Sequence, residues 1–158
     1  MSLAYVALGA NLGDPAATVR AAFAALSNLP ESRLLRTSSL YRTAPVGLAD
    51  QPEFINAAVA LETSLAPEAL LDTLFDIEAR FGRIRAERNG PRTLDLDLLL
   101  YDDQTLDLPR LILPHPRLHL RAFVLYPLAE IAPALNIPGR GPVAAWLPAV
   151  ANQGIVRL

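Results

Sequence analysis

The sequence predicts an α+β fold of the ferredoxin-like, split βαβ type (βαββαβ), with additions at its C-terminal end. Apolar residues alternate between strand and helix periods along the chain, and a length of 158 residues with 52% hydrophobic residues allows one sizeable core. No repeat or linker-like tract interrupts these patterns. We therefore expect a single domain spanning residues 1–158.

The predicted elements follow one another with short gaps. In order, they are a strand at 3–8, a helix that begins at Pro15 and is closed by Pro30, a strand at 34–42, a loop at 43–52, a strand at 54–63, a helix at 67–81, a strand at 93–101, a ribbon at 106–113, and helical turns after Pro116 and Pro142. The first helix has Asp14 at its N-cap and Pro15 at its first position, both favoured there. The second ends at Gly82 and carries an apolar stripe of Leu70, Leu74, Ile77 and Phe81, with Glu78 at its edge.

The strand at 54–63 separates apolar and polar side chains by its period of two. Ile55, Val59 and Leu61 fall on one face, and Phe54 and Asn56 fall on the other. Asn56 is therefore expected to face away from the core.

The strand at 93–101 has the clearest alternation in the chain. Leu94, Leu96, Leu98 and Leu100 are predicted on one face, and Asp95 and Asp97 lie together on the opposite face. Two neighbouring carboxylates repel each other unless a cation lies between them, and hard oxygen ligands suit magnesium bound to a nucleotide. The alternative is an ordinary solvated strand face, and the Asp-x-Asp pattern alone does not decide between them.

An arginine-rich segment precedes the two aspartates. It contains Arg83, Arg85, Arg88 and Arg92, and Gly82, Gly90 and Pro91 oppose helix formation there. Guanidinium groups bind phosphate oxygens in pairs, so a polyphosphate bridged to a metal would match both charge signs. The alternative is that these arginines only neutralise nearby carboxylates, such as those of Glu78 and Glu87.

Composition excludes several other chemistries. All fourteen basic residues are arginine and cysteine is absent, which removes the lysine of a phosphate-binding Walker loop, Schiff-base chemistry, disulfides and thiolate sites. A pI near 5.6 argues against general nucleic-acid binding. With neither a basic leader segment nor a long apolar run, we expect a cytoplasmic protein without a membrane span.

Two histidines have the spacing of a helical metal pair, His115 and His119, but Pro116 opposes that interpretation. A proline there suits the first helical position and leaves His115 at the cap, where it can donate to a phosphate near a helix N-terminus. His119 is expected at the surface.

Several sequence blocks together resemble the 6-hydroxymethyl-7,8-dihydropterin pyrophosphokinase family of folate biosynthesis. The most specific block is Arg88-Asn89-Gly90-Pro91-Arg92-Thr93-Leu94-Asp95-Leu96-Asp97-Leu98-Leu99. The others, in the family's order, are 7–13, 41–45, 51–57, 114–116 and 121–124. The resemblance extends from the N-terminus to about Pro133.

The resemblance implies a cytoplasmic monomer that transfers the terminal diphosphate of ATP to the hydroxymethyl group of the pterin and releases AMP. It implies that Asp95 and Asp97 hold two Mg²⁺ ions and that Arg83 and Arg92 neutralise the triphosphate. The implied ATP-binding residues are Glu78, Arg83, Arg85, Arg92, Leu98, Arg110, Ile112, His115 and Arg121. The implied pterin-binding residues are Thr43, Val46, Phe54, Asn56, Asp95 and Phe123. Asn89 and Phe75 depart from the pattern, which has an aromatic and a polar residue there.

Three other functions are compatible with the predicted fold. The first is a regulatory or RNA-binding module, although its sheet should carry stacked aromatics and positive charge where Asp95 and Asp97 lie. The second is a small-molecule sensor, which would differ from an enzyme by its lack of ATP turnover. The third is a kinase that transfers only the terminal phosphate, which would yield ADP instead of AMP.

Overall fold

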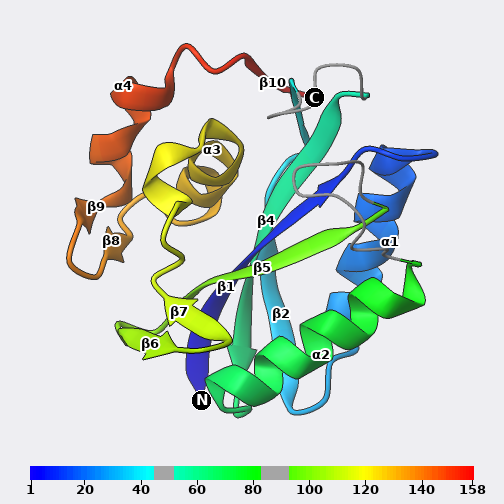
Figure 1. Cartoon of the computed structure of the whole chain (residues 1–158), viewed down its shortest axis with the longest axis vertical. Coiled ribbons are helices and arrows are strands. Elements are labelled where there is room, and N and C mark those ends of the chain that lie inside the picture. Colours follow the sequence, from blue (N-terminus) through cyan, green and yellow to red (C-terminus); the bar gives the residue numbers. More distant parts are fainter. Residues whose placement is uncertain (45–51, 83–92) are drawn as a thin grey trace.

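The computed structural model covers the whole chain and describes residues 1–44, 52–82 and 93–158 (Figure 1). Its main elements are β1 (Ser2–Ala10), α1 (Pro15–Ser27), β2 (Ser32–Thr37), β3 (Tyr41–Thr43), β4 (Phe54–Thr63), α2 (Pro67–Arg80), β5 (Asp95–Tyr101), β6 (Leu106–Leu108), β7 (Leu111–Leu113) and α3 (Ala122–Ile131). The last part of the chain adds β8 (Asn136–Ile137), β9 (Gly141–Pro142), α4 (Leu147–Val150) and β10 (Ile155–Arg157). Two 3₁₀ helices, η1 (Leu118–Leu120) and η2 (Val143–Trp146), precede α3 and α4. The α+β class predicted from the sequence is confirmed.

One antiparallel sheet organises the molecule. Its strand order is β10-β3-β4-β1-β5, and β2 also pairs with β4 beside β3. The long strand β4 therefore pairs with β3 along its first residues and with β2 along its last ones. Strand β5 lies at one end of this order, which leaves its outer side available to line a cavity.

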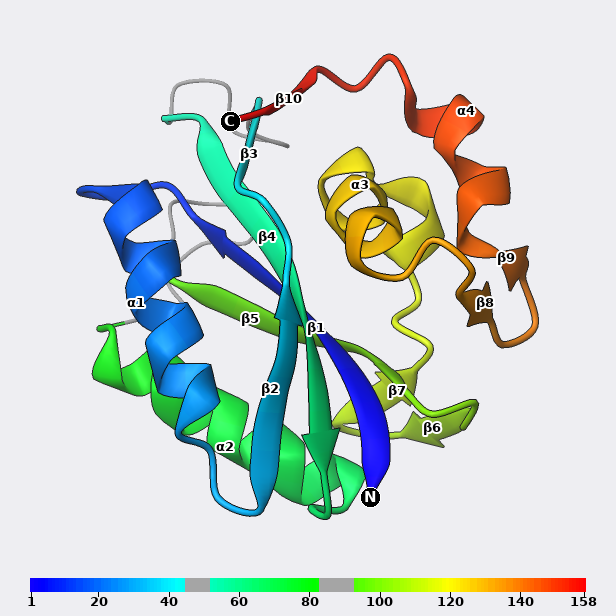
Figure 2. The ribbon, with the colours of Figure 1, turned by 180° about the vertical axis from the view of Figure 1, so that it is seen from behind.

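The two faces of the sheet bury separate apolar clusters. Helices α1 and α2 cover one face, and α3 covers the other (Figures 1 and 2). Val19 and Leu26 of α1 and Leu70, Leu74 and Ile77 of α2 are all fully buried in the first cluster. Burial of a leucine-sized side chain stabilises the fold by about 1.5–3 kcal/mol, so these two helices are held firmly to the sheet.

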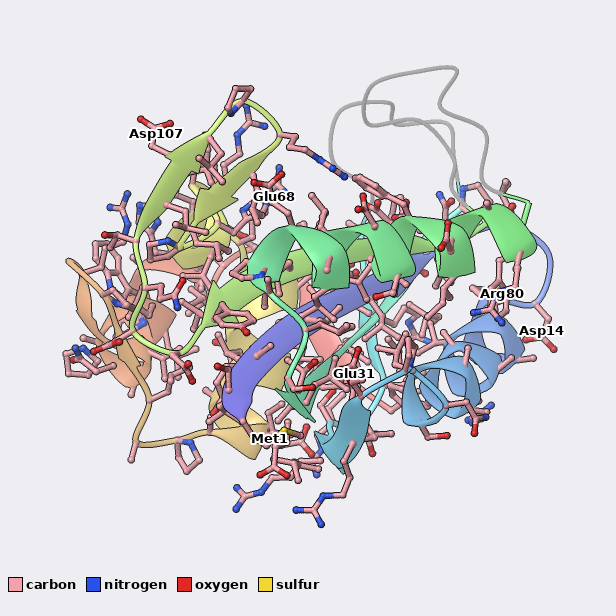
Figure 3. The ribbon with its side chains drawn as sticks, turned by 90° about the horizontal axis from the view of Figure 1, so that it is seen from below. Met1, Asp14, Glu31, Glu68, Arg80 and Asp107 are labelled. Atoms are coloured by element: carbon pink, nitrogen blue, oxygen red, sulfur yellow. The ribbon has the colours of Figure 1, made fainter. Side chains whose placement is uncertain are left out.

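Local signals fix the ends of both helices on the first face. The Asp14 carboxylate accepts a 3.2 Å hydrogen bond from the Ala17 N–H, and Pro15 occupies the first position of α1, as the sequence predicts. Gly82 follows α2 with a φ of 76°, a left-handed conformation that glycine adopts without strain. Figure 3 places Glu68, at the start of α2, near the end of the molecule that carries Asp107 on the β6–β7 hairpin.

Two sequence-based expectations about the strands are wrong. The stretch at 34–42 forms two strands, β2 and β3, which contact different parts of β4. Leu94, Leu96 and Leu98 belong to the α1–α2 cluster, but Leu100 belongs to the α3 cluster. A register shift between β1 and β5 at Tyr5/Val6 inserts an extra residue, which reverses the face on which the following side chains lie.

The helical turns expected after Pro116 are present, but Pro116 does not occupy the first helical position. Pro116 lies in a turn, the 3₁₀ helix η1 begins at Leu118, and the longer helix α3 begins only at Ala122. His119 is buried, where the sequence predicted a surface residue, and its ring packs edge-on against Trp146 with centroids 4.8 Å apart. His119 therefore contributes to the packing of η1 against η2.

A half-buried acidic group joins α3 to the sheet. The Glu130 carboxylate accepts hydrogen bonds from the Tyr41 hydroxyl at 2.7 Å and from the Ser39 N–H and hydroxyl, and it pairs with Arg157 of β10. Burial raises the pKa of Glu130, but the hydrogen bonds from Tyr41 and Ser39 and the charge of Arg157 outweigh burial and lower it overall. Among the described residues, no helix has the length and apolar composition needed to cross a membrane.

Candidate active site

A cavity of about 530 Å³ lies along the outer side of β5, between α2, the β6–β7 hairpin and the segment that leads into α3. This volume is within the range typical of small-molecule sites. Its polar and charged lining residues are Glu78, Asp95, Asp97, Arg110, His115, Arg117 and Arg121. Its apolar lining residues are Leu71, Phe75, Leu96, Leu98, Pro109, Leu111, Ile112 and Pro116. Thus eight residues singled out from the sequence, from Glu78 to Arg121, meet in one cavity.

The two aspartates lie at the start of β5, where both side chains are half-buried. The buried Glu78 of α2 accepts a 2.7 Å hydrogen bond from the backbone N–H of Leu96, the residue between them. A buried carboxylate needs such partners, because desolvation without them is costly. Glu78 therefore fixes the backbone that presents Asp95 and Asp97, in addition to lining the cavity.

His115 is a neutral hydrogen-bond donor in this setting. Burial, together with the positive charges of Arg121 and Arg117, lowers its pKa to about 4 against the opposing effect of Asp95. Its Nδ1 accepts a 3.2 Å hydrogen bond from the Arg117 backbone N–H, so the neutral ring carries its proton on Nε2. That N–H can serve a phosphate oxygen, as the sequence predicted, although the position lies in a turn before η1 and not at a helix cap.

Arg110 and Arg121 bring positive charge to the cavity from two different parts of the chain. Arg110, between β6 and β7, pairs with Asp72 and lies 4.0 Å from Glu68, so α2 holds its guanidinium at the cavity rim. Arg121 precedes α3, and its guanidinium lies 5.3 Å from the ring centroid of Phe123. This cation–π contact connects a predicted ATP-binding residue with a predicted pterin-binding residue.

Four of the residues predicted to bind the pterin lie outside the cavity lining, namely Thr43, Phe54, Asn56 and Phe123, whereas Asp95 is part of it. Asn56 of β4 is buried, and its Nδ2 donates a 2.7 Å hydrogen bond to the buried Thr43 hydroxyl of β3. Asn56 does lie on the face opposite the α1–α2 cluster, as its period predicts, but the same face is covered by α3 and is not solvent-exposed. Phe54, two residues earlier on β4, and Phe123 on α3 are half-buried.

Strand β1 joins the two groups. Gly9 pairs with Asn56 on its β4 side and with Asp95 on its β5 side. Two strand spacings separate Asn56 from Asp95, or roughly 10 Å between their backbones. A β-carbon at Gly9 would lie 3.0 Å from the Asn56 Oδ1, so the glycine leaves room for this amide.

Some predicted residues cannot be placed, and some lining residues were not predicted. Val46, Arg83, Arg85 and Arg92, together with Arg88 and Asn89, lie outside the described residues. Arg117 lines the cavity but was not selected, although the Pro-His-Pro-Arg sequence brings it next to His115. Asn11 is buried and donates a 3.0 Å hydrogen bond to the Pro52 carbonyl, which fixes the approach to β4. The sequence signal for Asn11 was its position in the block 7–13, one of those that resemble the family.

The arrangement combines two carboxylates, arginines, a neutral imidazole donor and an apolar wall. Within residues 1–44, 52–82 and 93–158, no three His, Asp or Glu side chains gather as a complete metal-binding set. A pair of carboxylates suits magnesium, which usually keeps several waters and binds through substrate phosphates as well. These features define a small α+β protein whose cavity suits a nucleotide polyphosphate.

Comparison with known proteins identifies the family. Residues 5–133 match the family described as 7,8-dihydro-6-hydroxymethylpterin-pyrophosphokinase (HPPK). The 2-amino-4-hydroxy-6-hydroxymethyldihydropteridine pyrophosphokinase of Pseudomonas aeruginosa is 53% identical over 154 residues, covering 98% of this chain and 95% of that protein. The protein of the same name from Haemophilus influenzae is 42% identical, covering 100% and 99%. The chain therefore belongs to the HPPK family.

Solved structures support the same fold. The HPPK-DHPS S436F/A437G/A613S protein of Plasmodium falciparum with pterin and p-hydrobenzoate has a TM-score of 0.75 at 15% identity, over 99% of this chain. The same triple mutant with SDX-DHP has a TM-score of 0.76 at 14% identity, over 96% of this chain. The chain spans less than half the length of these proteins, 47% and 43% respectively. At such low identity the likeness concerns the fold alone.

Proposed function

We propose that this protein transfers the terminal diphosphate of ATP to the hydroxymethyl group of 6-hydroxymethyl-7,8-dihydropterin, giving AMP and the pterin diphosphate, in tetrahydrofolate biosynthesis. The observation that carries this proposal is the family match over residues 5–133, which includes every residue selected for the site. The convergence of eight of those residues on one cavity supports it independently.

The proposed division of the site follows its two groups of residues. ATP occupies the cavity beside β5, where Leu98 and Ile112 contact the adenosine side with Arg110, and His115 and Arg121 contact the phosphates. The pterin lies beside β4, where Asn56 and Thr43 bind its polar edge and Phe54 and Phe123 stack on its faces. Val46, Arg83, Arg85 and Arg92 complete the assignment on the strength of the family's sequence blocks.

Magnesium is part of the proposal, with two ions held by Asp95 and Asp97. Their half-buried carboxylates project from adjacent positions of one strand face, and Glu78 steadies the backbone between them. Bound there, the ions would neutralise the phosphate charge that opposes attack by the hydroxymethyl oxygen.

The chemical step needs alignment and charge neutralisation more than a protein nucleophile. The hydroxymethyl oxygen attacks the β-phosphorus of ATP, the bond from that phosphorus to the oxygen bridging it to the α-phosphorus breaks, and AMP leaves while the hydroxyl proton passes to solvent. His115 donates its Nε2 proton as a hydrogen bond and stays neutral, because its pKa of about 4 is well below neutral pH. Arg121, beside Phe123, can neutralise phosphate charge close to the pterin.

The proposal also covers features of the whole chain. A single domain over residues 1–158 is supported by one sheet that connects both apolar clusters. The ferredoxin-like description is supported by the order β5-β1-β4-β2, with all pairs antiparallel and α1 and α2 on one face. A cytoplasmic monomer is proposed from the family's properties.

The decisive test is a product analysis. Protein, ATP, magnesium and the hydroxymethyl-dihydropterin are incubated, and the nucleotides and pterins are separated. We expect equal amounts of AMP and pterin diphosphate, and we expect a metal chelator in excess of magnesium to stop their formation. ADP as the nucleotide product would instead indicate transfer of a single phosphate, and the absence of any ATP turnover would refute the proposal.

A further inference from the structure

Arg121 lies in an extended backbone segment between two helices, and the start of the second helix is not capped by the Arg121 side chain. The 3₁₀ helix η1 ends at Leu120 and α3 begins at Ala122, with Arg121 between them at φ −124° and ψ 116°. The first N–H groups of a helix have no partner within the helix and need an outside acceptor. The side chain at the N-cap position of α3, Arg121, makes no capping hydrogen bond, and an arginine has no acceptor to offer.

Gln153 supplies the missing partners from the other end of the chain. Its Oε1 accepts a 2.9 Å hydrogen bond from the Ala122 N–H, and its Nε2 donates a 3.0 Å hydrogen bond to the Leu120 carbonyl. One amide therefore holds the peptide groups on both sides of Arg121, much as a neighbouring strand would. This grip fixes the backbone direction from which the Arg121 side chain reaches the cavity lining.

The segment that carries Gln153 is itself anchored to the other half of the site. Ile155 of β10 pairs with Thr43, whose hydroxyl accepts the hydrogen bond from Asn56. Arg157 then binds Ser39 and Glu130, and the Leu158 N–H donates to the Leu40 carbonyl at 2.9 Å. Residues 153–158 thus connect the start of α3 to the edge of the sheet that carries the pterin-binding group.

We infer that Gln153 is a positioning residue for the reaction, which holds Arg121 and Phe123 in register with the sheet that carries Asn56. This inference rests on the proposed function, since it concerns the same site. Gln153 is exposed, and its side-chain hydrogen bonds join the backbone groups of Leu120 and Ala122, so it acts on Arg121 through the backbone of residues 120–122.

The test replaces Gln153 by methionine, which keeps the length of the side chain and removes both hydrogen bonds. Calorimetric titration with ATP and magnesium, without pterin, should show ATP binding weakened by about three- to tenfold, the range that corresponds to about one net hydrogen bond. Pterin binding, measured with α,β-methylene-ATP present, should weaken as well. Gln104→Met, the same change in the exposed turn after β5, should bind both ligands as the parent does.

A double-mutant cycle separates positioning from simple stabilisation. If Gln153 acts through Arg121, Gln153→Met should have little further effect on ATP binding in an Arg121→Ala background. An equal loss in both backgrounds, or a lowered Tm with unchanged dissociation constants, would overturn the inference. The ATP titration does not depend on turnover, so a parent protein that forms no AMP refutes the proposed function while this test still decides the role of Gln153.

Discussion

Replacing Gly9 with alanine perturbs the pterin-binding group without removing any polar atom. Gly9 faces Asn56 across the β1–β4 pair, and a β-carbon there would lie 3.0 Å from the Asn56 Oδ1 and 4.0 Å from the Phe54 ring. No atom of Asp95 is among these close contacts, although Asp95 is the neighbour of Gly9 on the other side. The added methyl group therefore presses on one half of the site.

The size of the effect follows from how firmly the Asn56 amide is held. A 3.0 Å contact forces its neighbour to move by a few tenths of an ångström. Asn56 and Thr43 are both buried and joined by a 2.7 Å hydrogen bond, so the amide cannot turn toward solvent to escape. We expect the loss of about one net hydrogen bond in the pterin complex, roughly 0.7–1.4 kcal/mol, or a three- to tenfold weaker affinity.

Fold stability should change less than pterin affinity. Gly9 lies in β1 and does not have a positive φ, so alanine fits its backbone and reduces the entropy of the unfolded chain. This gain opposes the strain of the 3.0 Å contact, so the Tm should stay near that of the parent while the pterin affinity falls. A general destabilisation would not produce this combination.

Calorimetric titration measures the prediction directly. The dihydropterin is titrated in the presence of α,β-methylene-ATP, and ATP with magnesium is titrated separately as the internal control. Asn56→Ala alone should weaken pterin binding by about tenfold or more. In the Asn56→Ala background, Gly9→Ala should weaken pterin binding little further, because the amide that the added methyl group displaces is absent. Unchanged pterin affinity in Gly9→Ala, or an equal loss of ATP affinity, would refute the reasoning.

Three further predictions address the metal, the phosphates and the C-terminal strand. Asp97→Asn should remove most activity while Asp103→Asn, in an exposed turn, should not; near-parent turnover at saturating magnesium would contradict the role of Asp97. If the Arg92 guanidinium binds charge that develops during transfer, Arg92→Ala should lower kcat far more than it raises the KM for ATP in steady-state kinetics. An unchanged kcat would exclude this role of Arg92. Glu130→Gln should lower Tm at neutral pH, and the difference in Tm from the parent should shrink as the pH falls below about 4.5. The reason is that the pKa of Glu130 is lower in the folded than in the unfolded protein, so its charge stabilises the fold above the unfolded-state pKa and stops doing so in acid. A deficit that stays constant from pH 7 to pH 3 would show that the charge of Glu130 does not contribute.

Short-range patterns predicted the elements that carry the cavity. The capping residues of α1, the apolar stripe of α2 and the alternation of β5 all act within a few residues, so the sequence shows them directly. The Asp-x-Asp spacing put both carboxylates on one face, which the structure confirms by placing Asp95 and Asp97 in the same cavity lining. The individual binding roles remain proposals.

Contacts between distant parts of the chain were not predictable in this way. The burial of Asn56 depends on α3, which packs over the second face of the sheet and lies more than 60 residues later. The displacement of Leu100 depends on a register shift between β1 and β5, which neither strand shows alone. Gln153 has no local signal, because its partners are backbone groups near Arg121.

The register of β1 explains why two separate groups can serve one reaction. The rows Asn56–Gly9–Asp95 and Ala58–Ala7–Asp97 each cross β4, β1 and β5. Side chains alternate between sheet faces, so a slip of β1 by one residue would turn Ala10 or Leu8 toward this site in place of Gly9. Both are core residues of the α1–α2 cluster, and that burial opposes the slip. The packing of the opposite face thus holds a glycine between the amide and the carboxylates, where any larger side chain would press on Asn56.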